Sequence, residues 1–385
     1  MLLKALSITG CCIALAGCAA APRAPLPGQL PWRDQAFDYD AALVSVSKQD
    51  LFRLDAKLQS VLHDPDIQGT SAQKRLDRLV AFLFGPEVKD FHYAAGHSTI
   101  AAETWREKRG DCLSLTVLAY SLARELGLSV KMQEVRVPVV FDRRGRVDFL
   151  SRHVNLFVKE GGSLHLGSNL LRSGDVIIDF EPQVGSLRRG LVLPEEGIVA
   201  RYYNNVAAEH LAQGNLTLAY AYFKAAILAD PNYSPGYSNL AQLYIRRGFL
   251  ESAEQLLLRA IALNDEADIA MNALHQLLVS QGRETEALKY AKMLQARQDS
   301  DPYYWLGLGI DYLGRRKYRD AIDALEHAQT LTTGFEEVHR YLAVAYWKAG
   351  KQDQAKKQLA VLESLRLGPP SLAALSKKIS KDPRD

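Results

Sequence analysis

The chain has 385 residues, of which 48% are hydrophobic, and a formal net charge of +3. This length and composition are those of a folded protein with room for two hydrophobic cores. The charge gives no strongly basic surface of the kind that nucleic-acid binding requires. Short basic runs at 142–146 and 314–319 coincide with turn signals, so we expect solvated loops there and no nucleic-acid partner.

The N-terminus has the order of a bacterial export signal. Lys4 is followed by an apolar run over 5–16 and by small residues before Cys18, and this run is too short to span a bilayer. The segment 15–18 resembles the lipobox of bacterial lipoproteins, in which the cysteine is diacylated and becomes the first residue of the mature protein. The resemblance implies a signal peptide over 1–18 and a membrane anchor at Cys18.

Two alternatives to this anchor stay open. Cys11 fits the same loose pattern with a shorter apolar core, and an ordinary cleaved signal would leave Cys18 incidental. Ala19 follows the lipidated position, where by resemblance to lipoprotein sorting an aspartate would favour the inner membrane. We therefore expect the outer membrane, with the protein facing the periplasm. Residues 19–35 are proline-rich without a hydrophobic period, which predicts a tether.

One thiol remains in the expected mature protein. Cys11 and Cys12 leave with the signal and Cys18 carries lipid, so Cys112 has no partner for an intramolecular disulfide. Cys112 is either a buried, inert side chain or a nucleophile.

The local sequence places this thiol in the first turn of a helix. Asp111 is expected as the N-cap, apolar residues recur at helical spacing over 113–126, and Gly127 supplies the stop. The free amides and the dipole at a helix N-terminus favour a thiolate and can also hold an oxyanion. Cys112 therefore has the position of a nucleophile.

Two downstream strands carry candidate partners for this nucleophile. Over 152–158 the pattern alternates, which puts His153, Asn155 and Phe157 on one strand face. The run 176–182 is apolar until it ends, apart from Asp179. A buried carboxylate is costly unless it is paired and hydrogen-bonded, and a histidine is a natural partner.

This order of residues resembles the transglutaminase-like branch of the papain-type cysteine enzymes. The resemblance implies an α+β domain over 36–198, with Cys112 as the nucleophile, His153 as the general base and acid, and Asp179 as the orienting carboxylate. Many members have an aromatic residue two positions after the histidine, where this chain has Asn155. That difference puts the contacts on the substrate side in question.

Rival positions for the base and the carboxylate are His165 and Asp175, whose Gly and Ser neighbours indicate turns. The sequence shows no metal-ligand spacing and no glycine-rich phosphate loop, so we expect no metal and no cofactor.

The second half of the chain repeats with a step of 34 residues, which is typical of helix hairpins. One column of small residues recurs in five successive units: Ala219, Ala253, Ala287, Ala321 and Ala355. Glycines fall between the two helices of each unit, with Arg316 as the exception: Gly214, Gly248, Gly282 and Gly350. His275 replaces a small residue in the third unit, and we expect it to be hydrogen-bonded in the core.

These units resemble tetratricopeptide repeats, which implies an all-α solenoid of five repeats over 199–368. A final amphipathic helix over 369–380, within the segment 369–385, is expected to cover the last apolar face. Repeats of this family form a concave groove lined by the first helix of each unit. The groove residues that this resemblance implies are Asn204, Gln242, Asn272, Gln276 and Arg340, as contacts for an extended peptide, with an ordinary solvated surface as the alternative.

Two functions follow from this organisation. The first is a membrane-anchored periplasmic cysteine hydrolase or acyl transferase that acts on an amide bond of a peptide or protein, with repeats that recruit a protein partner. The alternative is a catalytically inactive adaptor that binds envelope proteins through its repeats. Both expect a protein or peptide partner and a membrane attachment through lipid.

Overall fold

The computed structural model describes residues 30–84, 91–94, 96–135, 141–144, 147–150, 153–159, 163–166, 169–173, 176–180, 190–263, 267–332 and 335–364. The expected signal peptide with Cys18, the tether as far as residue 29, the rival carboxylate Asp175 and the expected last helix lie outside these ranges. Within them, no helix combines the length and apolar character that crossing a membrane requires.

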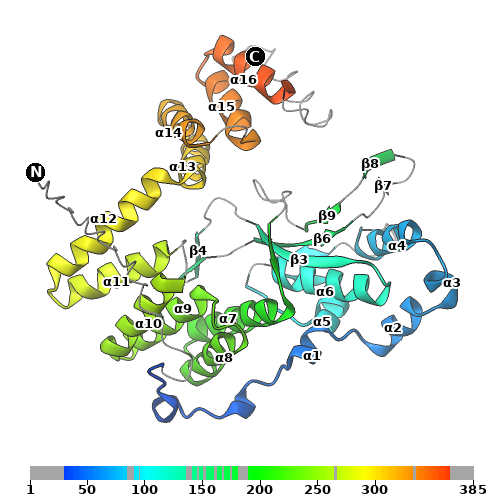
Figure 1. The fold of residues 1–385 in the computed structure, drawn as a ribbon, viewed down its shortest axis with the longest axis horizontal. Helices are drawn as coiled ribbons and strands as arrows, with labels where there is room; N and C mark the ends of the chain where they lie inside the picture. Colours follow the sequence, from blue (N-terminus) through cyan, green and yellow to red (C-terminus); the bar gives the residue numbers. More distant parts are fainter. Residues whose placement is uncertain are drawn as a thin grey trace, which may run out of the picture.

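The N-terminal half is α+β, with helix α6 at its centre (Figure 1). Almost every side chain of α6 from Cys112 to Ala123 is buried, because helices and a sheet surround it. Short helices before it supply leucines to the same core. Their bounds are α1 Lys48–Phe52, α2 Ala56–Leu62, α3 Pro65–Gln68, α4 Ala72–Phe84, α5 Ala101–Glu107 and α6 Cys112–Glu125.

The sheet that covers α6 has four antiparallel strands in the order β10-β3-β6-β9. Val154, Leu156 and Val158 of β6 point into the core, as the alternation predicts. The strands of this sheet are β3 Val130–Val135, β6 His153–Val158, β9 Val176–Ile178 and β10 Leu191–Leu193. Further two-stranded pairs are β1 His92–Tyr93 with β2 Arg109–Gly110, β4 Phe141–Arg144 with β5 Val147–Leu150, and β7 Ser163–Leu166 with β8 Asn169–Ser173.

Five helix hairpins form the C-terminal half, as the repeat pattern predicts. The recurring alanines are at most 1% exposed in all five units, so each lies at a close contact between helices. The hairpins are α7 Glu195–Gln213 with α8 Leu216–Ala229, α9 Ser234–Arg246 with α10 Leu250–Leu263, α11 Asp268–Ser280 with α12 Glu284–Ser300, α13 Pro302–Gly314 with α14 Tyr318–Leu331, and α15 Glu336–Lys348 with α16 Gln352–Ser364.

His275 and Gly309 occupy the same position in two successive units, and at both of them the two helices of the unit stay in contact. Half-buried His275 bonds through Nδ1 to the Ala287 carbonyl at 3.1 Å, so the predicted hydrogen bond is present. Gly309 lies where a Cβ would be 2.5 Å from Cγ of Leu325, so only glycine allows α13 to approach α14 this closely. Trp347 is buried in the core of the last units.

The turn within each hairpin needs a left-handed residue, and Arg316 adopts this conformation without being a glycine. Its φ is 60°, close to the 72° of Gly282 in the preceding unit. A left-handed backbone conformation destabilises a residue that has a Cβ by roughly 1 kcal/mol relative to glycine. We expect Arg316→Gly to stabilise α13 and α14 by about 1 kcal/mol, measured by hydrogen exchange of their amides.

The control for this prediction is Gly248→Ala, at the equivalent turn of the second unit with a φ of 79°. It should destabilise α9 and α10 by a similar amount. Faster exchange in Arg316→Gly would show that the arginine side chain stabilises its turn more than the backbone strain costs.

The repeats do not stack as one continuous array. Residues 230–233 separate α8 from α9, and four residues also separate α10 from α11 and α14 from α15. Only Asp301 separates α12 from α13, because α12 continues to Ser300. One extended residue cannot turn the chain back fully, so among the described helices α13 packs with α14 and α15 and not against α11.

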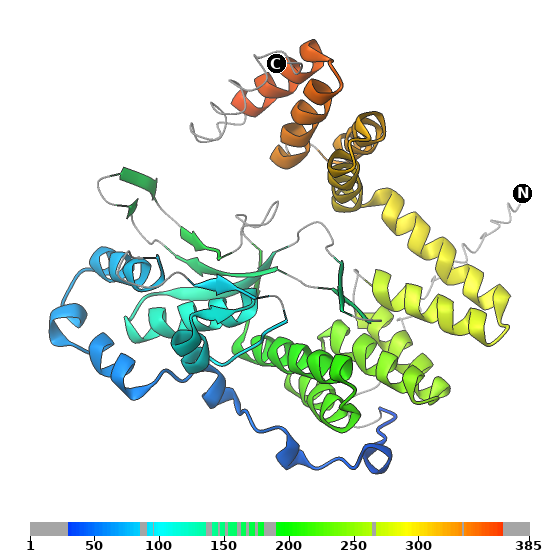
Figure 2. The same cartoon turned by 180° about the vertical axis from the view of Figure 1, so that it is seen from behind.

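This junction divides the hydrophobic core. One cluster joins the α+β half to the first three hairpins and reaches Ala287, and a second cluster holds α13 to α16. Both views show the last four helices set apart from the earlier hairpins at the far end of α12 (Figures 1 and 2).

An N-terminal segment, residues 30–46, lies along the first two hairpins; we call it the strap. It is the dark blue segment beneath α8 in Figure 1. Phe37 is 2% exposed and stacks on Tyr220 at 4.5 Å between ring centroids. Asp34 pairs with Lys224 of α8 at 2.7 Å. Residues 30–35, which the sequence analysis assigned to the tether, are therefore part of the folded protein.

Candidate functional site

Cys112 begins α6, and Asp111 caps that helix as predicted. The Asp111 carboxylate accepts from the Ser114 backbone N–H at 2.8 Å, which satisfies one of the free amides of the first turn. The thiol itself is 8% exposed. It lies beside strand β6, because the backbone N–H of Val154 donates to it.

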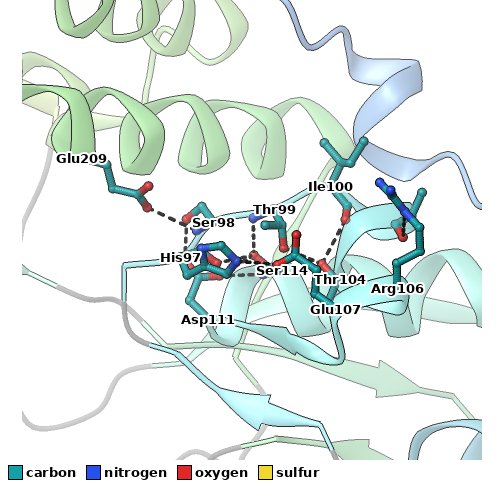
Figure 3. A network of polar contacts seen from close by, with 11 residues as sticks. His97, Ser98, Thr99, Ile100, Thr104, Arg106, Glu107, Asp111, Ser114 and Glu209 are labelled. Carbon is teal, nitrogen blue, oxygen red and sulfur yellow. Dashed lines mark hydrogen bonds and ion pairs between the residues drawn. The ribbon is translucent and has the colours of Figure 1, made fainter. Parts of the chain in front are cut away.

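A network of polar side chains holds this helix end (Figure 3). The Ser98 hydroxyl donates to the second oxygen of Asp111 at 2.5 Å, and the Asn205 amide of α7 reaches the same oxygen at 3.4 Å. Glu209, one turn later on α7, accepts from the Ser98 backbone N–H. The first repeat helix thus positions the loop and the cap from which the Cys112 helix starts.

The environment of Cys112 corrects one expectation of the sequence analysis. Burial raises the pKa of the Cys112 thiol to about 12, and the negative charge of Asp111 acts in the same direction. Backbone N–H groups of Val154 and Leu113 lower this pKa, but less than burial raises it. The expectation that the helix N-terminus makes Cys112 a resting thiolate is therefore wrong, since a buried sulfur beside a carboxylate holds its proton.

His153 and Asp179 come together, as the two strand patterns predict. Nε2 of His153 lies 2.7 Å from Oδ2 of Asp179, and the side chains are 5% and 2% exposed. Val154 follows His153 directly, and its carbonyl accepts from Thr116 of α6 at 3.1 Å. Cys112 thus contacts the residue that directly follows His153, and the His153–Asp179 pair lies at the start of the same strand, β6.

Asn155, which replaces the aromatic residue common in the family that the chain resembles, bonds to the carboxylate of this pair. It is fully buried and donates from Nδ2 to Asp179 Oδ2 at 3.3 Å. Gln133 of β3, which the sequence analysis did not single out, donates to the Asn155 carbonyl oxygen at 2.9 Å. The signal that could have identified Gln133 is a glutamine inside an otherwise strand-forming stretch, facing another amide across the sheet. The rival His165 lies on strand β7 rather than in the expected turn.

The described residues hold no cluster of three or more His, Cys, Asp or Glu side chains that could bind a metal ion.

The expected groove residues separate into different surroundings. Gln242 on α9 and Asn272 and Gln276 on α11 are exposed, and we call these three the inner repeat face. First helices pack on one another here, α7 on α9 and α9 on α11, more closely than the second helices α8 and α10 do. This difference in packing curves the array toward the first helices.

The other two groove residues are corrected by the structure. Asn204 is 6% exposed and accepts from the Asn239 amide at 2.9 Å, so it is a core residue. Arg340 belongs to α15, beyond the junction at Asp301, and pairs with Glu336 of its own helix. A single groove lined by all five residues is therefore absent, because the array breaks after α12.

Comparison with known proteins bears on the helical half. Residues 210–278 match the family model of the tetratricopeptide repeat. The helix hairpins within these matched residues are thus similar to tetratricopeptide repeats. Human cilia- and flagella-associated protein 70 is 26% identical over 194 residues, which is 49% of this chain and 17% of that protein. The chain thus spans less than a fifth of that relative's length.

Solved repeat proteins are similar to part of this chain. YrrB, described as a TPR protein with an unusual peptide-binding site, is 18% identical, with 46% of this chain and 92% of YrrB covered at a TM-score of 0.25. MamA from Desulfovibrio magneticus RS-1 is 18% identical, with coverage of 43% and 94% and a TM-score of 0.24.

Proposed function

We propose that this protein is a scaffold of the bacterial cell envelope that binds a protein or peptide through its repeats. The observation that carries the proposal is the inner repeat face, where Gln242, Asn272 and Gln276 are exposed on packed first helices. Amide side chains can both donate to and accept from the backbone of an extended peptide. Repeats of this kind form extended concave surfaces that bind proteins, which supports the same function.

The proposal includes a lipid anchor at Cys18. Residues 15–18 support it through their likeness to a lipobox, and two acyl chains anchor stably where one is marginal. The protein would face the periplasm from the outer membrane. Labelled palmitate recovered with the wild-type chain and not with Cys18→Ala tests this part of the proposal.

A photo-crosslinking amino acid, placed in turn at Gln276, Gln242 and Gln255, tests partner binding in intact cells. We expect a discrete adduct at Gln276 and at Gln242. We expect none at Gln255, an exposed glutamine on α10, the second helix of its repeat. Equal adducts at all three positions would indicate random collision and would overturn the proposal.

A second candidate function, a thiol hydrolase or acyl transferase, is favoured by the buried His153–Asp179 pair and by Cys112, which contacts Val154, the residue after His153. Asp179 orients the imidazole through Nε2, which makes Nδ1 the candidate base. We propose that His153 takes the thiol proton as the sulfur adds to an amide carbonyl, and that it then protonates the departing amine. Water or a second amine releases the acyl group from sulfur. This is the chemistry of the transglutaminase-like enzymes that the sequence resembles.

Mass spectrometry of envelope proteins tests the second candidate. Substrates should accumulate uncleaved in Cys112→Ala and in His153→Ala. Ser121→Ala is the matched control, because Ser121 is buried on the same helix and bonds only within it, to the Val117 carbonyl, in the contacts described. Identical protein profiles in wild type and Cys112→Ala would leave the scaffold as the sole function.

The raised pKa of Cys112 gives a pH prediction that applies to either function. At neutral pH we expect alkylation of the folded protein about a thousandfold slower than that of a free thiol with a pKa of about 8.5, with a rate that rises toward alkaline pH. Because the folded pKa lies above the unfolded one, the contribution to stability is fully present below about pH 8.5 and is lost as the pH rises from there to about 12. Fast labelling at pH 6 that disappears in His153→Ala would contradict this and reveal an ion pair with the imidazole.

A further inference from the structure

Three buried polar side chains form a line across the sheet toward His153. Gln133 on β3 faces Asn155 on β6 in the antiparallel register, and Asp179 directly follows β9 on the other side of β6. Gln133 is 1% exposed, Asn155 is fully buried, and the Asp179 side chain is 2% exposed. Amides buried to this degree are costly unless their hydrogen bonds are made.

The direction of every hydrogen bond in this line follows from one backbone group. Amide oxygen and nitrogen atoms are assigned from their partners, since either end of the side chain can be turned around. The N–H of Gly190 can only donate, and it lies 3.0 Å from Gln133. The contacting atom of Gln133 is therefore its oxygen, which turns the Gln133 NH₂ group toward Asn155.

The same reasoning passes along the line to the histidine. Asn155 accepts from Gln133 at 2.9 Å through its oxygen, so its own NH₂ group is turned toward Asp179. Oδ2 of Asp179 thus accepts from Asn155 at 3.3 Å and lies 2.7 Å from Nε2 of His153. An ionised Asp179 can only accept, so its bond to His153 places a proton on Nε2.

We propose that Gln133 and Asn155 are positioning residues that fix the tautomer of His153, with its proton on Nε2 and its lone pair on Nδ1. This inference rests on the second candidate function, in which Nδ1 is the base. It also explains Asn155 at the position where an aromatic residue is common in the family that the chain resembles: the amide here orients the carboxylate instead of contacting substrate.

Gly190 fixes the orientation of the Gln133 side chain through its N–H, and the space at position 190 admits only glycine. A Cβ at this position would lie 2.2 Å from the backbone oxygen of Glu134, the residue after Gln133. Only glycine brings its N–H close enough to β3 to hold the Gln133 oxygen.

Nitrogen NMR of the chain without its signal segment, labelled at histidine, tests the proposal. The His153 resonances are assigned by their loss in His153→Gln, and the ratio of the Nε2–H to the Nδ1–H tautomer is measured. In Asn155→Leu and in Gln133→Glu we expect this ratio to fall about fivefold, the change that one lost hydrogen bond produces. Gln133→Glu keeps the shape of the side chain and the hydrogen bond from Gly190, but an ionised glutamate cannot donate to Asn155. This variant therefore tests the direction of the hydrogen bond and not the packing of the side chain.

Ser121→Ala is again the control and should leave the ratio unchanged. A wild-type His153 with its proton on Nδ1, or a ratio unchanged in both variants, overturns the proposal. Because the tautomer is measured on the imidazole itself, the result does not depend on whether Cys112 reacts. An inert thiol with the expected tautomer shift would remove the second candidate function and leave the positioning role in place.

Discussion

Replacing Arg201 by alanine is expected to destabilise the protein by about 3–5 kcal/mol, the usual cost of breaking a buried ion pair from one side. Arg201 lies on α7, and its Nε donates to Glu134 of β3 at 2.7 Å. Both side chains are only 9% exposed, and the guanidinium also covers the ring of Tyr233. The variant removes the Arg201 guanidinium from a buried carboxylate at the contact between repeats and sheet. Urea unfolding followed by circular dichroism measures the loss.

Two variants separate this effect from the loss of an arginine in general. Arg283→Ala removes a partly buried ion pair with Glu254, whose side chains are 35% and 21% exposed, and should cost less than Arg201→Ala. The double variant Arg201→Met with Glu134→Leu removes both charges and should recover most of the stability, since apolar side chains replace buried pairs well. A loss in Arg201→Ala no larger than in Arg283→Ala would show that the contact between α7 and β3 does not hold the two halves together.

Truncating Phe37 to alanine is expected to cost about 3–5 kcal/mol and to release the strap. The ring lies in a cluster with Tyr220, Tyr244 and Phe249, at 4.5 to 6.0 Å between ring centroids, and it is 2% exposed. Its loss leaves a cavity beside Tyr220, where Tyr39 is a second ring of the strap in contact, at 5.8 Å between centroids. Limited proteolysis should then cut between residues 30 and 46, and unfolding should shift to lower urea concentration.

Phe84→Ala is the matched control for this prediction. Phe84 is 46% exposed at the end of α4, so its removal creates little cavity. Equal losses in the two variants, or a strap that resists proteolysis in Phe37→Ala, would show that the polar contacts of Asp34 and Arg33 hold the segment without the ring.

Local patterns predicted the parts of this fold in which spacing alone decides burial. The alanine column at a step of 34 residues lies at the helix contacts, and Asp111 caps the helix that begins at Cys112. A lone carboxylate in an apolar strand correctly implied a buried partner, which is His153 for Asp179. Each of these inferences needs only the period of a helix or strand and the cost of a buried charge.

The remaining features depend on contacts between distant segments. Nothing near Phe37 indicates that it stacks on Tyr220, nearly two hundred residues later. The break after α12 follows from a helix that continues to Ser300, and helix ends are the least certain part of a sequence prediction. The pKa of Cys112 was predicted in the wrong direction, because its burial and the nearby Asp111 charge outweigh the helix terminus.

Affinity for the cross-linked partner, measured by calorimetry with purified proteins, tests the scaffold proposal most directly. We expect the double variant Gln242→Ala with Gln276→Ala to raise Kd about tenfold or more, or about 1.4 kcal/mol. Gln255→Ala and Cys112→Ala should bind as the wild type does. A Kd unchanged in the double variant but raised in Cys112→Ala would contradict the proposal, because the partner would then be held at the thiol site and not on the inner repeat face.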